Sequence, residues 1–106
     1  MNITITKIKN YTKITIEKER LDVASMKAVK DDIFAIIEEH NKIILDMSKV
    51  HFLDSSGLSV LISILKMLNK IDDATLTLCA LQEQPSELME LTQLYNVFTI
   101  VESCDI

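Results

Sequence analysis

Glycine and proline are nearly absent, since the 106-residue chain contains one of each. Phosphate-binding loops of the P-loop and Rossmann types need several closely spaced glycines, so a chain whose only glycine is Gly57 has neither. Linkers between domains are often rich in glycine and proline. Their scarcity, in a chain of ordinary single-domain length, predicts that residues 1–106 form one domain.

Basic residues are in the minority, with 11 Lys and Arg against 16 Asp and Glu and a net charge of −5. Surfaces that bind nucleic acid need clustered cations, so we expect no direct contact with DNA or RNA. No apolar run approaches the roughly 20 residues that span a bilayer, and the polar N-terminus does not resemble a signal peptide. We therefore expect a cytoplasmic protein that does not insert into membranes.

The two cysteines, Cys79 and Cys104, lack the CxxC spacing of metal and redox motifs. Cys79 falls in an apolar strand pattern and Cys104 lies near the end of the chain, so we expect unpaired thiols in a reducing compartment. A metal site made of His51, Asp54 and Cys79 would combine three segments without a recognised ligand spacing. We expect neither a bound metal nor a cofactor.

Strand and helix patterns alternate along the chain. Apolar residues recur at every second position in the two opening segments, which favours an antiparallel hairpin, and at helical spacing in later segments. The expected strands are Asn2–Ile8, Thr12–Lys18, Lys42–Met47, Thr75–Leu81 and Val97–Val101. The expected helices are Met26–His40, a segment of about fifteen residues ending near Lys70, and a short segment from Pro85 to Leu94. The order β-β-α-β-α-β-α-β predicts an α/β fold with a mainly parallel sheet of four to five strands.

Two local features refine this prediction. Lys42–Met47 is apolar at nearly every position, which favours a strand with helices above and below the sheet. Ser25 stands directly before the first helix, where its hydroxyl is expected to cap a free backbone NH.

The stretch Asp54–Leu58, with the sequence DSSGL, is the main candidate for function. Ser55 and Ser56 stand at the start of a predicted helix, where free NH groups and the helix dipole stabilise an anion. The same residues also have a purely structural interpretation, because Asp54, Ser55 or Ser56 could each cap the helix. The residues alone leave both interpretations open.

A serine hydrolase is disfavoured by the residues around the two serines. A nucleophile elbow needs a small residue two positions before the serine, where this chain has Leu53 or Asp54. His40 ends an expected exposed helix, and His51 lies four residues before Ser55, an unusual arrangement for a catalytic triad. We expect no enzymatic activity.

Three segments together resemble a known family. The strand Lys42–Met47, followed by Phe52–Leu58 and an apolar helix, resembles the STAS domain of the anti-sigma factor antagonists. Arg20–Asp22 is similar to the short acidic turn with which this family faces its partner. The resemblance covers nearly the whole chain and implies a STAS-like fold.

The resemblance also implies a function. In that family the serine directly after the aspartate is phosphorylated by an anti-sigma factor with serine kinase activity and a histidine-kinase-like ATPase fold. The unphosphorylated antagonist binds this anti-sigma factor and frees a sigma factor, and a PP2C-type phosphatase reverses the modification. On this chain the phosphoacceptor would be Ser55, with Ser56 capping the helix. The implied partner-binding residues are Asp22, Asp54, Ser55, Ser56, Leu58 and Ser59.

A STAS domain without a phosphorylation switch is the alternative. Such a domain would serve as an accessory subunit of a protein assembly, for instance a lipid-transport ABC complex. It would bind its partner equally well as Ser55→Ala and as Ser55→Asp. Binding of a nucleotide or another small ligand is a third possibility, with no sequence feature in its favour.

Overall fold

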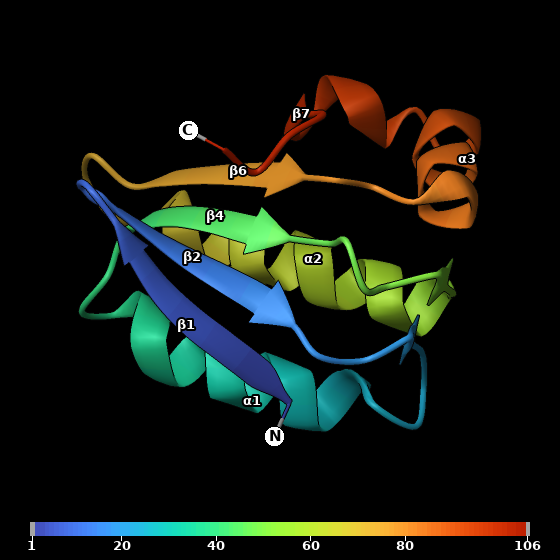
Figure 1. Ribbon diagram of the computed structural model, residues 1–106, viewed down its shortest axis with the longest axis horizontal. Coiled ribbons are helices and arrows are strands. Elements are labelled where there is room, and N and C mark those ends of the chain that lie inside the picture. Colours follow the sequence, from blue (N-terminus) through green and yellow to red (C-terminus); the bar gives the residue numbers. More distant parts are fainter. Residues whose placement is uncertain (1, 106) are drawn as a thin grey trace.

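A five-stranded sheet forms the centre of the computed structural model, which describes residues 2–105 (Figure 1). Its strands are β1 (Ile3–Ile8), β2 (Tyr11–Ile16), β4 (Lys42–Asp46), β6 (Thr75–Cys79) and β7 (Thr99–Val101). The spatial order is β1-β2-β4-β6-β7, with β1 antiparallel to β2 and every other neighbouring pair parallel. The predicted α/β class, with an antiparallel hairpin leading into a mainly parallel sheet, is confirmed.

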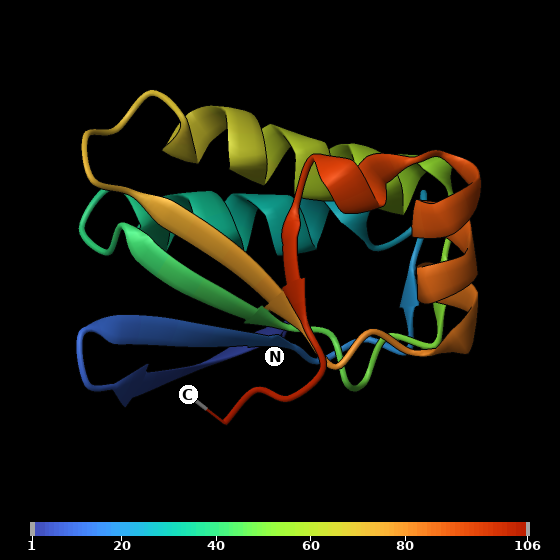
Figure 2. The same cartoon turned by 90° about the horizontal axis from the view of Figure 1, so that it is seen from above.

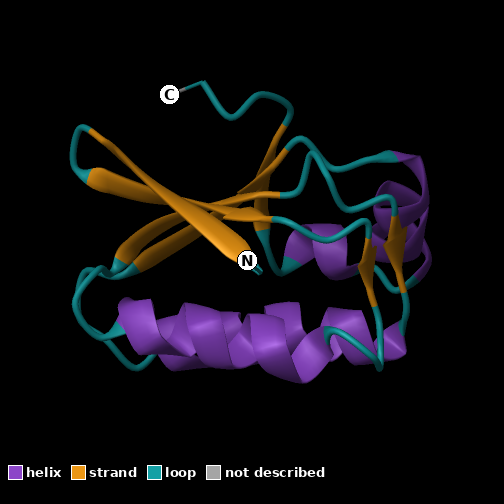
Figure 3. Ribbon diagram, turned by 60° about the horizontal axis from the view of Figure 1, so that its bottom comes forward, coloured by secondary structure: helices purple, strands orange, loops and turns teal. Residues whose placement is uncertain are grey.

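Helices α1 (Met26–Ile37) and α2 (Ser55–Leu68) lie side by side on one face of this sheet (Figures 2 and 3). Their apolar stripes pack on the residues of β4 that point toward them, Ile43 and Leu45. The prediction of helices on both faces was wrong, because the chain after β7 crosses the opposite face instead. Ile44, which points to that opposite face, is nevertheless fully buried.

Among the residues that the structure describes, no helix has both the length and the apolar character needed to span a bilayer.

The ends of the helices differ from the prediction by a few residues. Ser25 does occupy the N-cap position of α1, but its hydroxyl donates to the carbonyl oxygen of Arg20 (2.7 Å) and makes no capping bond. Helix α3 (Glu83–Leu91) contains Pro85 in its first turn, as expected, but stops before Leu94. The chain leaves the helical conformation at Gln93, which has a left-handed φ of 61°, and a 3-10 turn, η1 (Leu94–Asn96), follows.

Two very short strands were missed by the sequence analysis. β3 (Arg20–Leu21) and β5 (Phe52–Leu53) pair in parallel as a separate small sheet. A two-residue strand has no periodicity to detect, so the residues alone gave no signal for either one. The pair lies beside the start of α2 (Figure 1) and links two segments that are far apart in sequence.

Cys79 and Cys104 form a disulfide, so the expectation of unpaired thiols was wrong. After β7 the chain turns back along β6, where the NH of Ala80 donates to the carbonyl oxygen of Glu102 (3.2 Å). This places the two cysteine Cα atoms 5.2 Å apart, within the range that a disulfide bridges. The pairing could not be predicted from cysteine spacing, because it depends on where the segment after β7 packs.

Candidate functional site

The DSSG stretch begins α2 at the end of the molecule where the carboxyl ends of β2, β4 and β6 also lie (Figure 1). Asp54 has an extended backbone, and its Oδ1 accepts a hydrogen bond from the NH of Gly57 (2.8 Å). Asp54 is therefore the residue that caps the helix. The interpretation in which Ser56 caps α2 was wrong. Neither serine hydroxyl makes the capping hydrogen bond.

The accessible hydroxyl of this stretch belongs to Ser55. Ser55 is exposed and Ser56 is half-buried, and neither hydroxyl forms a hydrogen bond with any of the residues 2–105. The hydroxyl of Ser59 is also exposed but donates to the carbonyl oxygen of Ser56 (2.6 Å). Leu58 is different from these, since it is only 8% exposed and packs in the core beneath the site.

Gly57 allows the start of α2 to touch β3. A Cβ atom at this position would overlap the backbone carbonyl oxygen of Leu21 and lie 2.7 Å from the Cδ1 atom of Leu53. The φ angle of Gly57 is not positive, so the requirement for glycine comes from space and not from backbone conformation. The contact fixes the first turn of α2 against the β3–β5 pair.

The β3–β5 pair also brings two predicted site residues together. Leu21 is paired with Leu53 in parallel register, so Asp22 and Asp54 occupy matching positions just after the two strands. The NH of Asp54 donates to the carbonyl oxygen of Leu21 (3.4 Å). Asp22, Asp54 and Ser55 therefore share one end of the molecule although more than thirty residues separate the first two.

Asp22 is held in place by several donors. Its carboxylate accepts hydrogen bonds from the NH groups of Ala24 (3.1 Å) and Ser25 (3.3 Å) and from Nε of Arg20 (3.3 Å). Desolvation acts to raise the pKa of Asp22, but these hydrogen bonds outweigh it and hold the pKa below its ordinary value. The side chain is thus ionised and fixed at neutral pH.

Two further contacts support the site and were not foreseen. The guanidinium of Arg20 lies 4.1 Å from the centre of the Phe52 ring, so adjacent positions of β3 and β5 stack as a cation–π pair. The side-chain amide of Gln84 on α3 accepts from the NH of Leu53 (2.8 Å) and donates to its carbonyl oxygen (2.9 Å). Gln84 thereby occupies the open edge of β5. No sequence pattern predicts this contact, because the two residues are far apart along the chain.

A known protein family matches nearly the whole of this chain. The family model of the STAS domain matches residues 2–105. The chain belongs to the STAS domain family.

Solved structures of STAS proteins have the same fold. An anti-sigma factor antagonist from Mycobacterium paratuberculosis is 19% identical, with a TM-score of 0.86 over 97% of this chain and 86% of that one. An anti-sigma-factor antagonist (STAS) domain protein from Planctomyces limnophilus is 19% identical, with a TM-score of 0.85 over 96% and 90%. The Bacillus cell fate determinant SpoIIAA, in its phosphorylated form, is 14% identical, with a TM-score of 0.73 over 97% and 92%. At these identities the likeness establishes the fold.

Proposed function

We propose that this STAS domain is an anti-sigma factor antagonist that is switched off by phosphorylation of Ser55. The observation that carries the proposal is the state of the Ser55 hydroxyl, which is exposed and unbonded among the described residues at the first position of α2. Two proteins of the same fold are named as anti-sigma factor antagonists, and a third, SpoIIAA, has a phosphorylated form. The proposed role is that of a cytoplasmic binding protein without enzymatic activity of its own.

The proposed partner face surrounds Ser55. It consists of Asp22, Asp54, Ser55, Ser56 and Ser59, with Leu58 supporting them from the core. Val23 adds an apolar contact next to Asp22, because it is 72% exposed. The partner is an anti-sigma factor with serine kinase activity and a histidine-kinase-like ATPase fold, and a PP2C-type phosphatase restores the active form.

The charges around Ser55 suit such a switch. A phosphate adds about −1.5 to −2 charges at neutral pH. Arg20 partly offsets the charge of Asp22, whereas Asp54 has no ion pair within residues 2–105 and lies directly beside Ser55. Phosphorylation therefore creates a cluster of negative charge on this face. The partner binds the same face only when Ser55 is unphosphorylated and neutral.

The fold itself is expected to tolerate the phosphate. The backbone NH groups at the start of α2 and the positive end of its dipole stabilise a nearby anion. Phosphorylation would then weaken the complex without unfolding the antagonist. A loss of about 2.7 kcal/mol corresponds to a hundredfold weaker complex, enough to dissociate one of micromolar affinity at cellular concentrations.

The test is a phosphorylation assay with the cognate kinase-like anti-sigma factor, ATP and magnesium, followed by mass spectrometry. We expect one phosphate on the wild type and on Ser56→Ala, and none on Ser55→Ala. Binding of the anti-sigma factor should be retained by Ser55→Ala and weakened about a hundredfold by Ser55→Asp or by the phosphate. A phosphate on another residue, or no phosphate with a partner proven to bind, contradicts the proposal.

The same pair of variants distinguishes the alternative. If Ser55→Ala and Ser55→Asp retain the same native partner equally in a pull-down, the domain is an accessory subunit without a phosphorylation switch. Recovery of transporter subunits with both variants would identify a lipid-transport complex of the kind considered above.

A further inference from the structure

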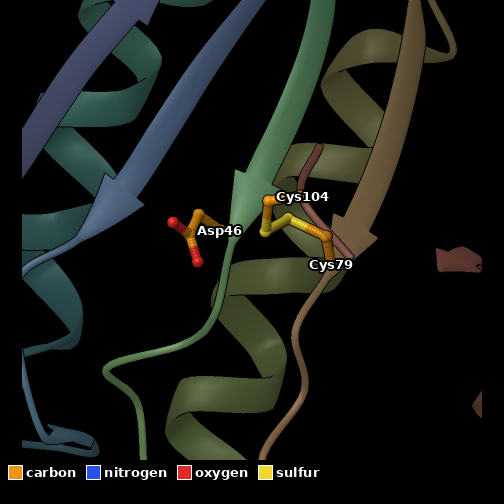
Figure 4. A group of neighbouring side chains, drawn as sticks. All are labelled: Asp46, Cys79 and Cys104. Carbon is orange, nitrogen blue, oxygen red and sulfur yellow. A yellow bond between two sulfur atoms is a disulfide. The ribbon is translucent and has the colours of Figure 1, made fainter. Parts of the chain in front are cut away.

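A row of polar side chains crosses the sheet on the face opposite α1 and α2. Thr15 of β2 is paired with Asp46 of β4, and Asp46 is paired with Cys79 of β6, so the three side chains point to the same face. Cys104, in the segment that follows β7, reaches this row through its disulfide with Cys79 (Figure 4). The row lies at the carboxyl ends of the parallel strands β2, β4 and β6.

Asp46 is unusual because it is a nearly buried carboxylate without a cationic partner. It is 8% exposed, and no Lys, Arg or His of residues 2–105 forms an ion pair with it. Its Oδ2 accepts from the hydroxyl of Thr15 (3.2 Å) and its Oδ1 accepts from the NH of Ser48 (2.9 Å). Each carboxylate oxygen has two acceptor sites, so both oxygens keep capacity for another ligand.

The donor atoms of this row lie close together. One carboxylate oxygen of Asp46 and the sulfur atoms of Cys79 and Cys104 are all within 4.8 Å of one another. Among the described residues this group brings three potential metal ligands together, with its two sulfur atoms joined in the disulfide, whereas His51, Asp54 and Cys79 are not brought together. Ligands of a tetrahedral zinc ion with Zn–S bonds of about 2.3 Å stand roughly 3.8 Å apart.

We propose that the reduced protein binds one zinc-like divalent cation through Cys79, Cys104 and Asp46. A dithiol reductant first transfers two electrons and two protons to the disulfide, giving two cysteine thiols and the oxidised reductant. The cation then replaces the two thiol protons, which are released to water. Two thiolates and one carboxylate surround the ion, and a water molecule occupies the fourth position.

Three features favour this cation. Thiolates select zinc and other soft or borderline ions over magnesium and calcium. The hydroxyl of Thr15 and the NH of Ser48 donate hydrogen bonds to the carboxylate and orient it. Metal-binding carboxylates in proteins are usually oriented by hydrogen bonds of this kind. A divalent ion also gives a cationic partner to a nearly buried carboxylate that the rest of the described chain leaves unpaired, while the two thiolates balance the charge of the ion. A reducing compartment would keep the two cysteines available.

The test is a titration of the full, reduced chain with Co²⁺ under anaerobic conditions, after removal of the reductant. We expect one Co²⁺ per chain, with a thiolate-to-metal charge-transfer band and the visible absorption of tetrahedral cobalt, both removed by Zn²⁺. The oxidised chain should give neither band, because a disulfide offers no thiolate. A reduced wild type without the charge-transfer band would overturn the proposal.

Two variants test the ligands, and a third serves as the control. Asp46→Asn should weaken Co²⁺ binding by about a hundredfold, and Cys104→Ser should weaken both the binding and the charge-transfer band, because only the Cys79 thiolate remains. Asp105→Asn is the matched control, since it removes an exposed carboxylate next to Cys104 and should leave the affinity unchanged. Circular dichroism verifies that each variant is folded. Wild-type affinity in folded Asp46→Asn, or a wild-type spectrum in Cys104→Ser, would overturn the assignment of that ligand and with it the site.

Discussion

Asp54 has two roles that a single carboxylate performs at once. Its oxygen caps α2 through the NH of Gly57, and its charge lies beside the proposed phosphoacceptor Ser55. Only the first of these roles needs an oxygen atom, and only the second needs a charge. Substitution by asparagine or by alanine therefore separates the two.

We predict that Asp54→Ala lowers the free energy of unfolding by about 1 kcal/mol, since a helix cap is lost. Asp54→Asn should stay within a few tenths of a kcal/mol of the wild type, because its side-chain oxygen also accepts from Gly57. Urea denaturation of the wild type and both variants measures the difference. Equal stability of the alanine and asparagine variants would mean that the capping bond contributes nothing.

At the scale of residues, a role could be predicted from the sequence where a family motif specified it. Roles that depend on the local backbone conformation or on burial could not be predicted. Ser55 was selected by its position after Asp54 in a family motif, and its exposure is consistent with that choice. Ser56 was expected to cap the helix once the family motif had assigned Ser55 as the phosphoacceptor. Any of three adjacent polar residues could cap, and only the backbone conformation and the hydrogen bond of Asp54 distinguish them. Leu58 was included in the partner face, but it shares a helical stripe with the buried Leu61 and Leu68 and packs inside.

The β3–β5 pair depends on its neighbours at the scale of elements. Each strand has only two residues, so the pair is stabilised by the first turn of α2 on one side and by Gln84 of α3 on the other. The closeness of α2 requires that position 57 has no side chain. A larger residue there would push α2 away from β3.

We predict that Gly57→Ala lowers the free energy of unfolding by about 3 kcal/mol, the upper part of the range for overpacking, because its Cβ meets backbone that cannot move aside. Thermal or urea unfolding measures the effect. Ser56→Ala is the matched control, since it removes an adjacent side chain that forms no hydrogen bond within residues 2–105, and it should change stability by less than about 0.5 kcal/mol. A Gly57→Ala variant as stable as this control would show that the backbone of Leu21 yields easily.

Long elements were predictable, and among the short ones only β7 was. The hairpin strands and the two long helices repeat an apolar pattern often enough to be recognised, and their existence was confirmed. β3, β5 and η1 have two or three residues each, and their conformation is set by contacts with distant segments. The same limit applies to Cys104, whose pairing with Cys79 follows from how the segment after β7 folds back.

At the scale of the whole molecule, acid stability depends on carboxylates that hold separate segments together. Glu17, just after β2, accepts a hydrogen bond from Nζ of Lys49 (2.6 Å) and another from the hydroxyl of Thr4 on β1 (2.7 Å). These bonds, that of Lys49 first, lower the pKa of Glu17 below its ordinary value. Asp22 also has a lowered pKa in the folded protein.

We predict that the protein loses stability as the pH falls from about 6 to about 3. The lowered pKa values mean that the unfolded chain takes up protons first, so the stabilisation is complete above the unfolded pKa and disappears as the pH falls through the folded pKa. The urea midpoint measured across this range should fall less steeply for Glu17→Gln than for the wild type. Glu38→Gln, an exposed carboxylate without an ion pair in the described chain, is the control, and equal slopes for the two variants would contradict the role of Glu17.

The short β3–β5 sheet also offers a way to observe the partner face without labels. The NH groups of His51 and Phe52 are bonded to the carbonyl oxygen of Glu19, and that of Asp54 to Leu21. A sheet this small opens more readily than the central strands, so these amide hydrogens should exchange with deuterated water early. A protein that docks over Ser55 would slow their exchange while leaving the β1–β2 hairpin unchanged. The smallest sheet of the molecule thus reports whether the site is occupied.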